Sequence, residues 1–254
     1  MKLPLLLIAV GFTQFTLANP LDDNCPDHVS SHGAPVSTIV DSQYTCNLNY
    51  GVHFRYDTKV AEYVVYRIDP EDISGAVSRK DNFRPDPSIE SKFNVTLQQY
   101  AGSGYDRGHL SPAADNSASV EQMSQSFYLS NMAPQNSSQN RGSWRILEDR
   151  IRSIAREGNV LYVAVGTVYE PGYIVVNNGL GIPQYLWKIV VDAETNNAIA
   201  FLFPNEPLAT SLLPSTITTI DRIEEMTGLD FNPNVDDDSF EAANADMNFW
   251  KNIK

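Results

Sequence analysis

The sequence of 254 residues is poor in basic side chains. It has 18 lysines and arginines against 31 aspartates and glutamates, so its formal net charge is −13. This shortage argues against a protein that coats nucleic acid, because phosphate binding usually requires a basic surface. Repeats and low-complexity tracts are also absent, and the 42% hydrophobic and 19% charged content is that of a globular protein. Disordered and fibrous classes are therefore excluded.

The sequence also lacks an apolar run long enough to span a bilayer. Residues 3–12 are apolar but are far fewer than the ~20 residues that a transmembrane helix needs. Lys2 precedes this run and Thr16-Leu17-Ala18 follows it, which is the order of a secretory signal peptide. We predict that residues 1–18 are cleaved near Ala18 and that the chain is secreted, extracellular or periplasmic, without membrane contact.

Cysteine is scarce, with only Cys25 and Cys46 in the chain. In an oxidising compartment an even pair 21 positions apart is most simply a disulfide, worth about 3 kcal/mol in the chain-entropy model. Two free thiols or two metal ligands are the alternatives. No second cysteine pair is available to complete a zinc site, so we expect the disulfide.

No linker divides the chain, so we expect a single domain over residues 19–254. Its first part, residues 19–45, is rich in Pro, Ser, Asp and His and is predicted to be irregular. Its last part, residues 233–254, is predicted to be an acidic tail. Residues 69–105 are predicted to be a long loop region. Apolar periodicity predicts strands over residues 50–57, 61–68, 159–167, 185–192 and 198–204, and helices over about 140–157 and 215–227. This order favours an α+β fold, with a mixed, mainly antiparallel sheet flanked by helices.

Histidine is scarce as well, and His109 is the only one beyond residue 53. Histidine is the side chain best suited to proton transfer near neutral pH, and Arg107 and Gly108 lie directly before this one. A structural histidine is the alternative. Asn140, Glu148 and Arg152 are spaced to share one face of the predicted helix, which suits a hydrated cation beside a phosphate. A solvated face with a Glu148–Arg152 ion pair is the alternative there.

Several of these residues form a known pattern in order. Asp106-Arg107-Gly108-His109, followed by Asn131, Asn140 and Glu148, closely resembles the DNA/RNA non-specific endonucleases, which are ββα-metal or His-Me finger nucleases. This family includes secreted bacterial nucleases and mitochondrial endonuclease G. The resemblance covers about residues 50–232 and includes later segments such as 182–188. It implies a fold with a ββα-metal active-site motif and cleavage of both DNA and RNA to 5′-phosphate ends.

The resemblance also implies roles for individual residues. His109 is expected to be the general base that activates water. Asn140 is expected to be the one protein ligand of Mg²⁺, with Mn²⁺ as an alternative metal and Glu148 binding through water. The carried-over supporting residues are Asn131, which positions the His109 region, Asp106, which orients the motif, and the phosphate-binding arginines Arg107 and Arg152.

Three points stay open. The family has a further phosphate-binding arginine upstream, and both Arg79 and Arg84 fit that place, with Arg79 favoured. The chain is either a monomer or a homodimer. An inactive nucleic-acid-binding relative is the alternative function. A calcium-binding protein, suggested by Asp236–Asp238, is disfavoured because that cluster lacks the spacing and glycine of an EF-hand.

The negative charge is unevenly distributed along the chain. Residues 79–156 contain ten basic and eight acidic side chains, whereas residues 221–254 contain three basic and nine acidic ones. The charge is thus concentrated away from the motif, and net charge governs solubility and steering rather than what one groove binds. We predict that the activity depends less steeply on salt than the binding of strongly basic proteins does.

Overall fold

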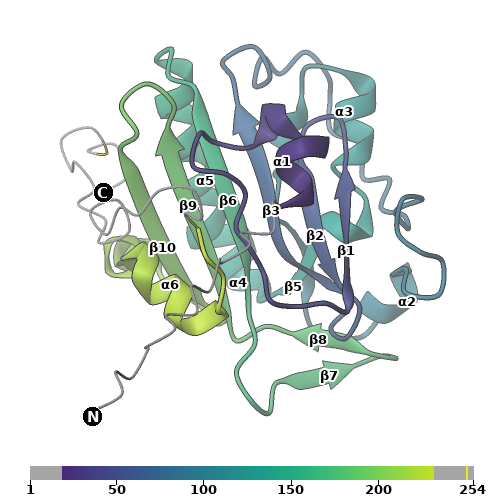
Figure 1. Ribbon diagram of the computed structural model, residues 1–254. Coiled ribbons are helices and arrows are strands. Elements are labelled where there is room, and N and C mark those ends of the chain that lie inside the picture. The colour runs from purple at the N-terminus through teal and green to yellow at the C-terminus, as the bar shows by residue number, and fades with distance from the viewer. Residues whose placement is uncertain (1–18, 232–249, 251–254) are drawn as a thin grey trace, which may run out of the picture.

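A seven-stranded antiparallel sheet forms the centre of the computed structural model, which describes residues 19–231 and 250 (Figure 1). The strand order is β1-β2-β3-β6-β9-β10-β11. These strands are β1 (Ser42–Cys46), β2 (Gly51–Arg55), β3 (Val60–Ile68), β6 (Leu161–Val168), β9 (Tyr185–Asp192), β10 (Ala198–Pro204) and β11 (Ile217–Thr218). Every neighbouring pair in this order is antiparallel, so the α+β class is confirmed and the sheet is not mixed within the described residues.

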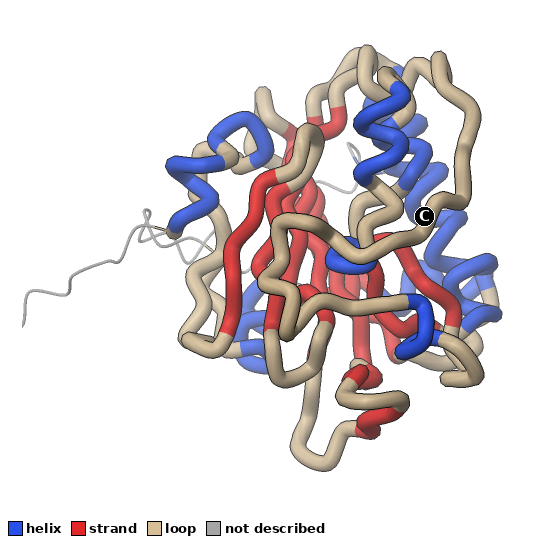
Figure 2. The backbone as a smooth tube through the Cα atoms, turned by 90° about the vertical axis from the view of Figure 1, so that its right-hand side faces the viewer, coloured by secondary structure: helices blue, strands red, loops and turns tan. Residues whose placement is uncertain are grey.

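The two faces of the sheet carry two hydrophobic cores, because successive side chains of a strand point to opposite sides. In β9, Leu186 and Val190 join the core under α5 (Arg145–Arg156), whereas Trp187 and Ile189 join the core on the other face. That second face is covered by the N-terminal segment with α1 (Pro20–Asn24) and by α6 (Ile220–Thr227). Figure 2, turned by 90°, shows helices on both sides of the strands.

Shorter helices and strands lie between the strands of the main sheet along the chain. They are α2 (Leu97–Tyr100), β4 (Asp106–His109), α3 (Val120–Gln125), β5 (Met132–Gln135), α4 (Ser137–Gln139), β7 (Ile174–Val176) and β8 (Leu180–Ile182). β4 pairs only with β5, and β7 only with β8, so each forms a two-stranded sheet beside the main one. Short 3₁₀ turns cover Pro26–His28, Ala113–Asn116, Leu129–Asn131 and Thr210–Thr216.

The five predicted strands are confirmed within a few residues at their ends, and two helix predictions need correction. The late helix begins at Ile220 rather than 215, because residues 210–216 form a 3₁₀ turn containing Pro214 and the next two residues pair with β10. It ends as expected at Gly228, whose φ of 73° is the left-handed conformation that glycine tolerates best. The second correction, to the helix over 140–157, concerns the candidate site.

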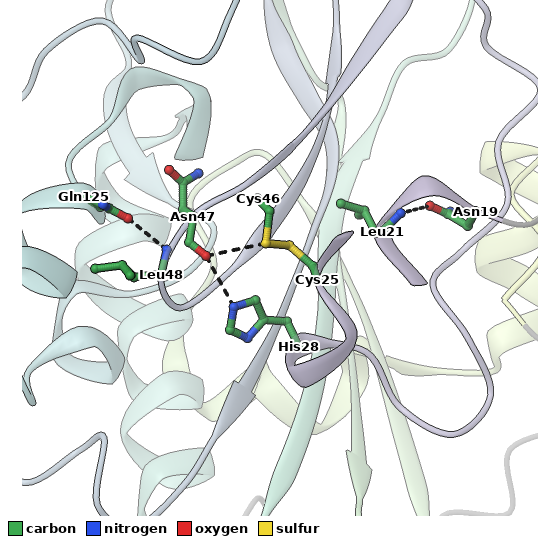
Figure 3. Close-up of a disulfide and its surroundings, with 8 residues drawn as sticks. All are labelled: Asn19, Leu21, Cys25, His28, Cys46, Asn47, Leu48 and Gln125. Carbon is green, nitrogen blue, oxygen red and sulfur yellow. Dashed lines mark hydrogen bonds between the residues drawn. A yellow bond between two sulfur atoms is a disulfide. The ribbon is translucent and has the colours of Figure 1, made fainter. Parts of the chain in front are cut away.

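The N-terminal segment is less irregular than predicted, because it contains α1 and the start of β1. The predicted disulfide between Cys25 and Cys46 is confirmed and links the end of α1 to the end of β1 (Figure 3). His28 and the two sulfurs lie within 4.8 Å of one another, but the disulfide uses both sulfurs and leaves no thiolate for a metal.

Two predictions concern residues outside the described part of the chain, namely the signal peptide over 1–18 and most of the acidic tail over 233–254. Trp250 is the one described residue of that tail, and it is fully buried in the core under α5. Over residues 19–231 and 250, no helix has the length and apolar character to cross a bilayer.

Candidate active site

The Asp106–His109 segment forms β4, which pairs with β5 so that Gly108 lies opposite Ala133. Glycine is required here, because a Cβ at position 108 would lie 2.0 Å from Oε1 of Gln135. Gln135 is fully buried and donates from Nε2 to Oε1 of Gln139 at 2.9 Å. Gln139 in turn donates to the carbonyl of Pro204 at 2.6 Å, so the strand pair is held against β10.

Asn131 lies fully buried beneath this strand pair and does not line the cavity. Its amide donates to the carbonyl oxygens of Ser111 and Ser126, each at 2.9 Å, and its Oδ1 accepts from the backbone N–H of Ser111 at 2.8 Å. These bonds hold the chain that leaves His109. The positioning role of Asn131 that the resemblance implies stays a prediction.

A cavity of about 770 Å³ opens over β4 and the start of α5. It brings together seven of the residues for which the sequence analysis expects a role, which are Arg79, Asp106, Arg107, His109, Asn140, Glu148 and Arg152. Arg84 is not among its lining residues. The Arg84 guanidinium lies 4.3 Å from the ring centroid of Tyr128 and donates to the carbonyl of Ser124 at 2.7 Å. Of the two upstream arginines, Arg79 is therefore the one that faces the cavity.

His109 is half-buried between two aromatic rings, with ring centroids 5.7 Å from Phe83 and 5.0 Å from Phe127. Its Nε2 is buried and has no hydrogen-bond partner among the described residues. Burial, followed by the charges of Arg79 and Arg107, lowers the pKa of His109 from 6.5 to about 3. At neutral pH the imidazole is therefore uncharged and can accept a proton.

Asn140 lies where a continuous helix was predicted, but the helix α5 begins only at Arg145. Residues 140–144 form a π-type segment, and Gly142 departs from helical geometry with φ −105° and ψ −108°. Such bulges in a helix are frequent at functional sites. Within the segment, the amide of Asn140 donates to Oδ2 of Asp106 at 2.9 Å. No hydrogen-bond donor of residues 19–231 and 250 engages its Oδ1, which could therefore accept a cation.

Asp106 holds this amide with help from Arg141, whose guanidinium donates to both carboxylate oxygens at 2.8 and 2.7 Å. Burial alone would raise the pKa of Asp106, but the hydrogen bonds from Arg141 and Asn140 outweigh it and the pKa is lowered. The carboxylate is therefore ionised and fixes the orientation of Asn140. The orienting role of Asp106 in the motif stays a prediction.

Arg152 is buried, with only 5% of the residue exposed, and its charge is already compensated. It donates to Oδ1 of Asp115 at 2.6 Å and to Oδ1 of Asp149 at 2.6 Å. The alternative Glu148–Arg152 ion pair does not occur within the described chain. Burial would lower the pKa of Arg152, but Asp115 and Glu148 outweigh it and raise the pKa. Arg107, in contrast, is exposed and stacks 4.2 Å from the centroid of Phe83.

Comparisons with known proteins identify the family. The sequence profile of the DNA/RNA non-specific endonucleases matches residues 28–238. The chain belongs to this family. It is 31% identical over 230 residues to a mitochondrial nuclease EXOG of Xenopus laevis, covering 84% of this chain and 63% of that protein. It is 30% identical over 217 residues to a nuclease of Nostoc sp., covering 81% of this chain and 78% of that protein.

Further relatives include human mitochondrial endonuclease G, 31% identical over 194 residues, with 70% of this chain and 65% of that protein covered. Among solved structures, the EndoG/EndoGI complex superposes with a TM-score of 0.74 at 24% identity, covering 82% of this chain and 91% of that chain. This likeness shows the fold. The chain spans less than two thirds of the length of the Xenopus relative. The resemblance to the DNA/RNA non-specific endonucleases, predicted from the sequence, is confirmed.

Three residues of the site were missed by the sequence reasoning. Arg141 orients Asp106, Asp115 pairs with Arg152, and Lys188 lies 3.6 Å from Oε1 of Glu148. For Lys188 a signal was present, because a lysine inside the otherwise apolar strand 185–192 is unusual. Asp115 carried no signal, since its partner lies 37 positions away.

Proposed function

We propose that this member of the family is a metal-dependent nuclease that hydrolyses phosphodiester bonds of DNA and RNA, with His109 as the general base. One observation carries this proposal. An uncharged His109 without a hydrogen-bond partner at Nε2 shares a single cavity with an amide oxygen, a carboxylate and several arginines. These are the groups that water activation and phosphate binding require.

The oxygen atoms present fit a hydrated divalent cation. Oδ1 of Asn140 has no hydrogen-bond donor within the described part of the chain, and Glu148 lines the same cavity with a side chain that is 11% exposed. Mg²⁺ prefers oxygen ligands and keeps several of its waters, which matches one protein ligand and one carboxylate acting through water. Mn²⁺ is an alternative. When bound, such an ion would stabilise the negative charge that develops on the phosphate and on the leaving 3′ oxygen.

The other residues of the cavity serve proton transfer, phosphate binding and charge compensation. His109 removes the proton of the attacking water. Arg107 and Arg79 are exposed arginines of the cavity, and we assign them the binding of the phosphate oxygens. Arg141 and Arg145 are also exposed in the cavity, but they are paired with Asp106 and Asp149. Arg152 is buried and forms ion pairs with Asp115 and Asp149. We therefore propose that it compensates the negative charge of Glu148 and Asp115 and does not contact the substrate directly. The water oxygen forms a bond to phosphorus while the bond from phosphorus to the 3′ oxygen breaks. The 3′ oxygen takes up a proton from solvent, so the products are a 3′-hydroxyl and a 5′-phosphate end.

We further propose that the mature chain is exported and acts outside the cytoplasm. The Cys25–Cys46 disulfide supports this location, because disulfides persist in oxidising compartments. The relatives named from Xenopus and human are mitochondrial, so the destination of this chain needs its own test. Expression of the full sequence with a C-terminal tag, followed by N-terminal sequencing of the extracellular or periplasmic fraction, should give Asn19 as the first residue. Retention of residues 1–18 on a cytoplasmic product would contradict export.

The activity is tested on the purified chain with plasmid DNA and with RNA, each in Mg²⁺ and in EDTA. We expect cleavage of both in Mg²⁺ and of neither in EDTA. His109→Ala should abolish cleavage while the thermal unfolding temperature is unchanged, and His32→Ala, which alters a histidine outside the cavity, serves as the matched control. Binding of DNA without cleavage in any divalent metal would favour an inactive relative instead.

A further inference from the structure

A fully buried lysine lies behind the carboxylate of Glu148. Lys188 is in the middle of β9 and is 0% exposed. Its side chain leaves the same face of the sheet as those of Leu186 and Val190, which belong to the apolar core under α5. Its Nζ lies 4.6 Å from the ring centroid of Trp144 and 3.6 Å from Oε1 of Glu148. Within residues 19–231 and 250, Glu148 is the only carboxylate that forms an ion pair with Lys188.

This position is costly for a charged group. Within the described residues, neither Nζ of Lys188 nor Oε1 of Glu148 has a hydrogen-bond partner. Removing an ammonium group from water costs several kcal/mol by typical estimates, and apolar side chains of similar volume are often at least as stabilising as a buried ion pair. The surrounding core would accept such a side chain. Stability therefore does not explain a lysine at this position, and its contact with Glu148 suggests a functional reason.

The contact determines which way the Glu148 carboxylate faces. Oε1 is buried and turned toward Lys188, while the side chain keeps 11% of its surface exposed and lines the cavity that contains His109 and Asn140. Oε2 is thus the oxygen left for the cavity. Arg152, whose charge also acts on Glu148, is already bound to Asp115 and Asp149. Lys188 is therefore the cation available to hold Glu148 from behind.

We propose that Lys188 is a positioning residue of the metal site. It holds Glu148 with one oxygen toward the sheet and the other toward the waters of a hydrated divalent cation next to Asn140. This inference rests on the proposed nuclease function and extends it to a residue that does not touch the cavity. Outer partners of metal-binding groups typically change metal affinity or activity by about 10- to 100-fold when they are replaced.

The test replaces Lys188 by a neutral side chain of similar length, Lys188→Met. Mg²⁺ binding is measured by calorimetry without nucleic acid, and kcat/KM is measured on plasmid DNA. We expect both the Mg²⁺ affinity and kcat/KM to fall by about 10- to 100-fold. Lys92→Met is the matched control, because Lys92 is exposed and paired with Glu90 outside the cavity, and it should change neither quantity. Unchanged Mg²⁺ affinity in Lys188→Met would overturn the proposal.

A double variant separates positioning from a general structural role. If Lys188 acts through Glu148, then Lys188→Met should cause no additional loss in a Glu148→Gln background. Losses that multiply would show that Lys188 acts elsewhere and would overturn the proposal. Lys188→Leu is a second neutral variant if Lys188→Met does not fold. Failure of both to fold would mean that the fold itself needs the ammonium group, which contradicts the argument from stability.

Failure of this inference is distinguishable from failure of the proposed function. If the unaltered chain cleaves no nucleic acid with any divalent metal, the proposed function is wrong. If it cleaves, and His109→Ala abolishes cleavage while Lys188→Met retains the original Mg²⁺ affinity, only the role of Lys188 is wrong.

Discussion

Replacement of Gly108 by alanine tests how tightly the candidate active site depends on the pairing of β4 with β5. A Cβ at this position would lie 2.0 Å from Oε1, 2.8 Å from Cβ and 3.0 Å from Cδ of Gln135. Gln135 cannot swing away easily, because it is fully buried and hydrogen-bonded to Gln139. The strands must therefore separate, and overpacking of this kind costs about 1–3 kcal/mol of unfolding free energy.

Function should suffer more than stability, because His109 follows Gly108 directly in β4. A displacement of about 1 Å in a reacting group can cost about 100-fold in rate. We therefore expect Gly108→Ala to lose about 1–3 kcal/mol in urea unfolding and about 100-fold in kcat/KM on plasmid DNA. The measurement is repeated in a Gln135→Gly background, where the atoms that the new Cβ would meet are removed.

In that background, Gly108→Ala should cost less than it does in the original chain, because the clash has been relieved. This difference is a double-mutant cycle between positions 108 and 135. Equal losses in both backgrounds, or an unimpaired Gly108→Ala, would refute the reasoning from the close approach of the two strands.

Three further predictions follow from the structure and the charge distribution. The pKa of His109 is held at about 3, and the base acts when deprotonated, so kcat/KM should not fall through a group of pKa near 6.5 as the pH is lowered; an acidic limb near that value in a pH profile would contradict the lowered pKa. Cys25→Ser combined with Cys46→Ser should lower the unfolding free energy by about 3 kcal/mol in urea titrations, and equal stability would remove the disulfide as a stabilising element. Cleavage should depend weakly on salt, because the cavity lining contains five arginines and four acidic residues; a steep loss of kcat/KM between low and moderate salt would contradict this.

The chemistry-bearing residues were recognisable in the sequence because they lie close together along the chain. Asp106 to His109 form one strand, and Asn140 and Glu148 lie on adjoining helical segments. The order and spacing of these residues identified the family, and the apolar periodicity predicted the strands on both sides of the site. Alternation and local spacing express short-range geometry, which a sequence contains directly.

The sequence was least informative about short elements and about the interruption of α5. The pair β4–β5 has four residues in each strand and no alternating pattern, so only its pairing in three dimensions defines it. Gly142 could be read as an isolated glycine in a helix, but its departure from helical geometry is decided by the surrounding packing. The sequence favoured Arg79 over Arg84 as the upstream phosphate-binding arginine but could not place either side chain. In the structure Arg79 lines the cavity, whereas Arg84 contacts Tyr128 and Ser124.

The amino-acid sequence by itself therefore determined the family, the candidate base and the candidate metal-binding groups of this protein. The tertiary structure decided how these groups are supported: Asp106 orients Asn140, Asp115 compensates Arg152, and Lys188 faces Glu148 from the sheet. These partners are 34, 37 and 40 positions apart in the chain. Contacts over such separations exist only after β9 packs against α5 and the β4–β5 pair forms beside it, so no local pattern could have predicted them.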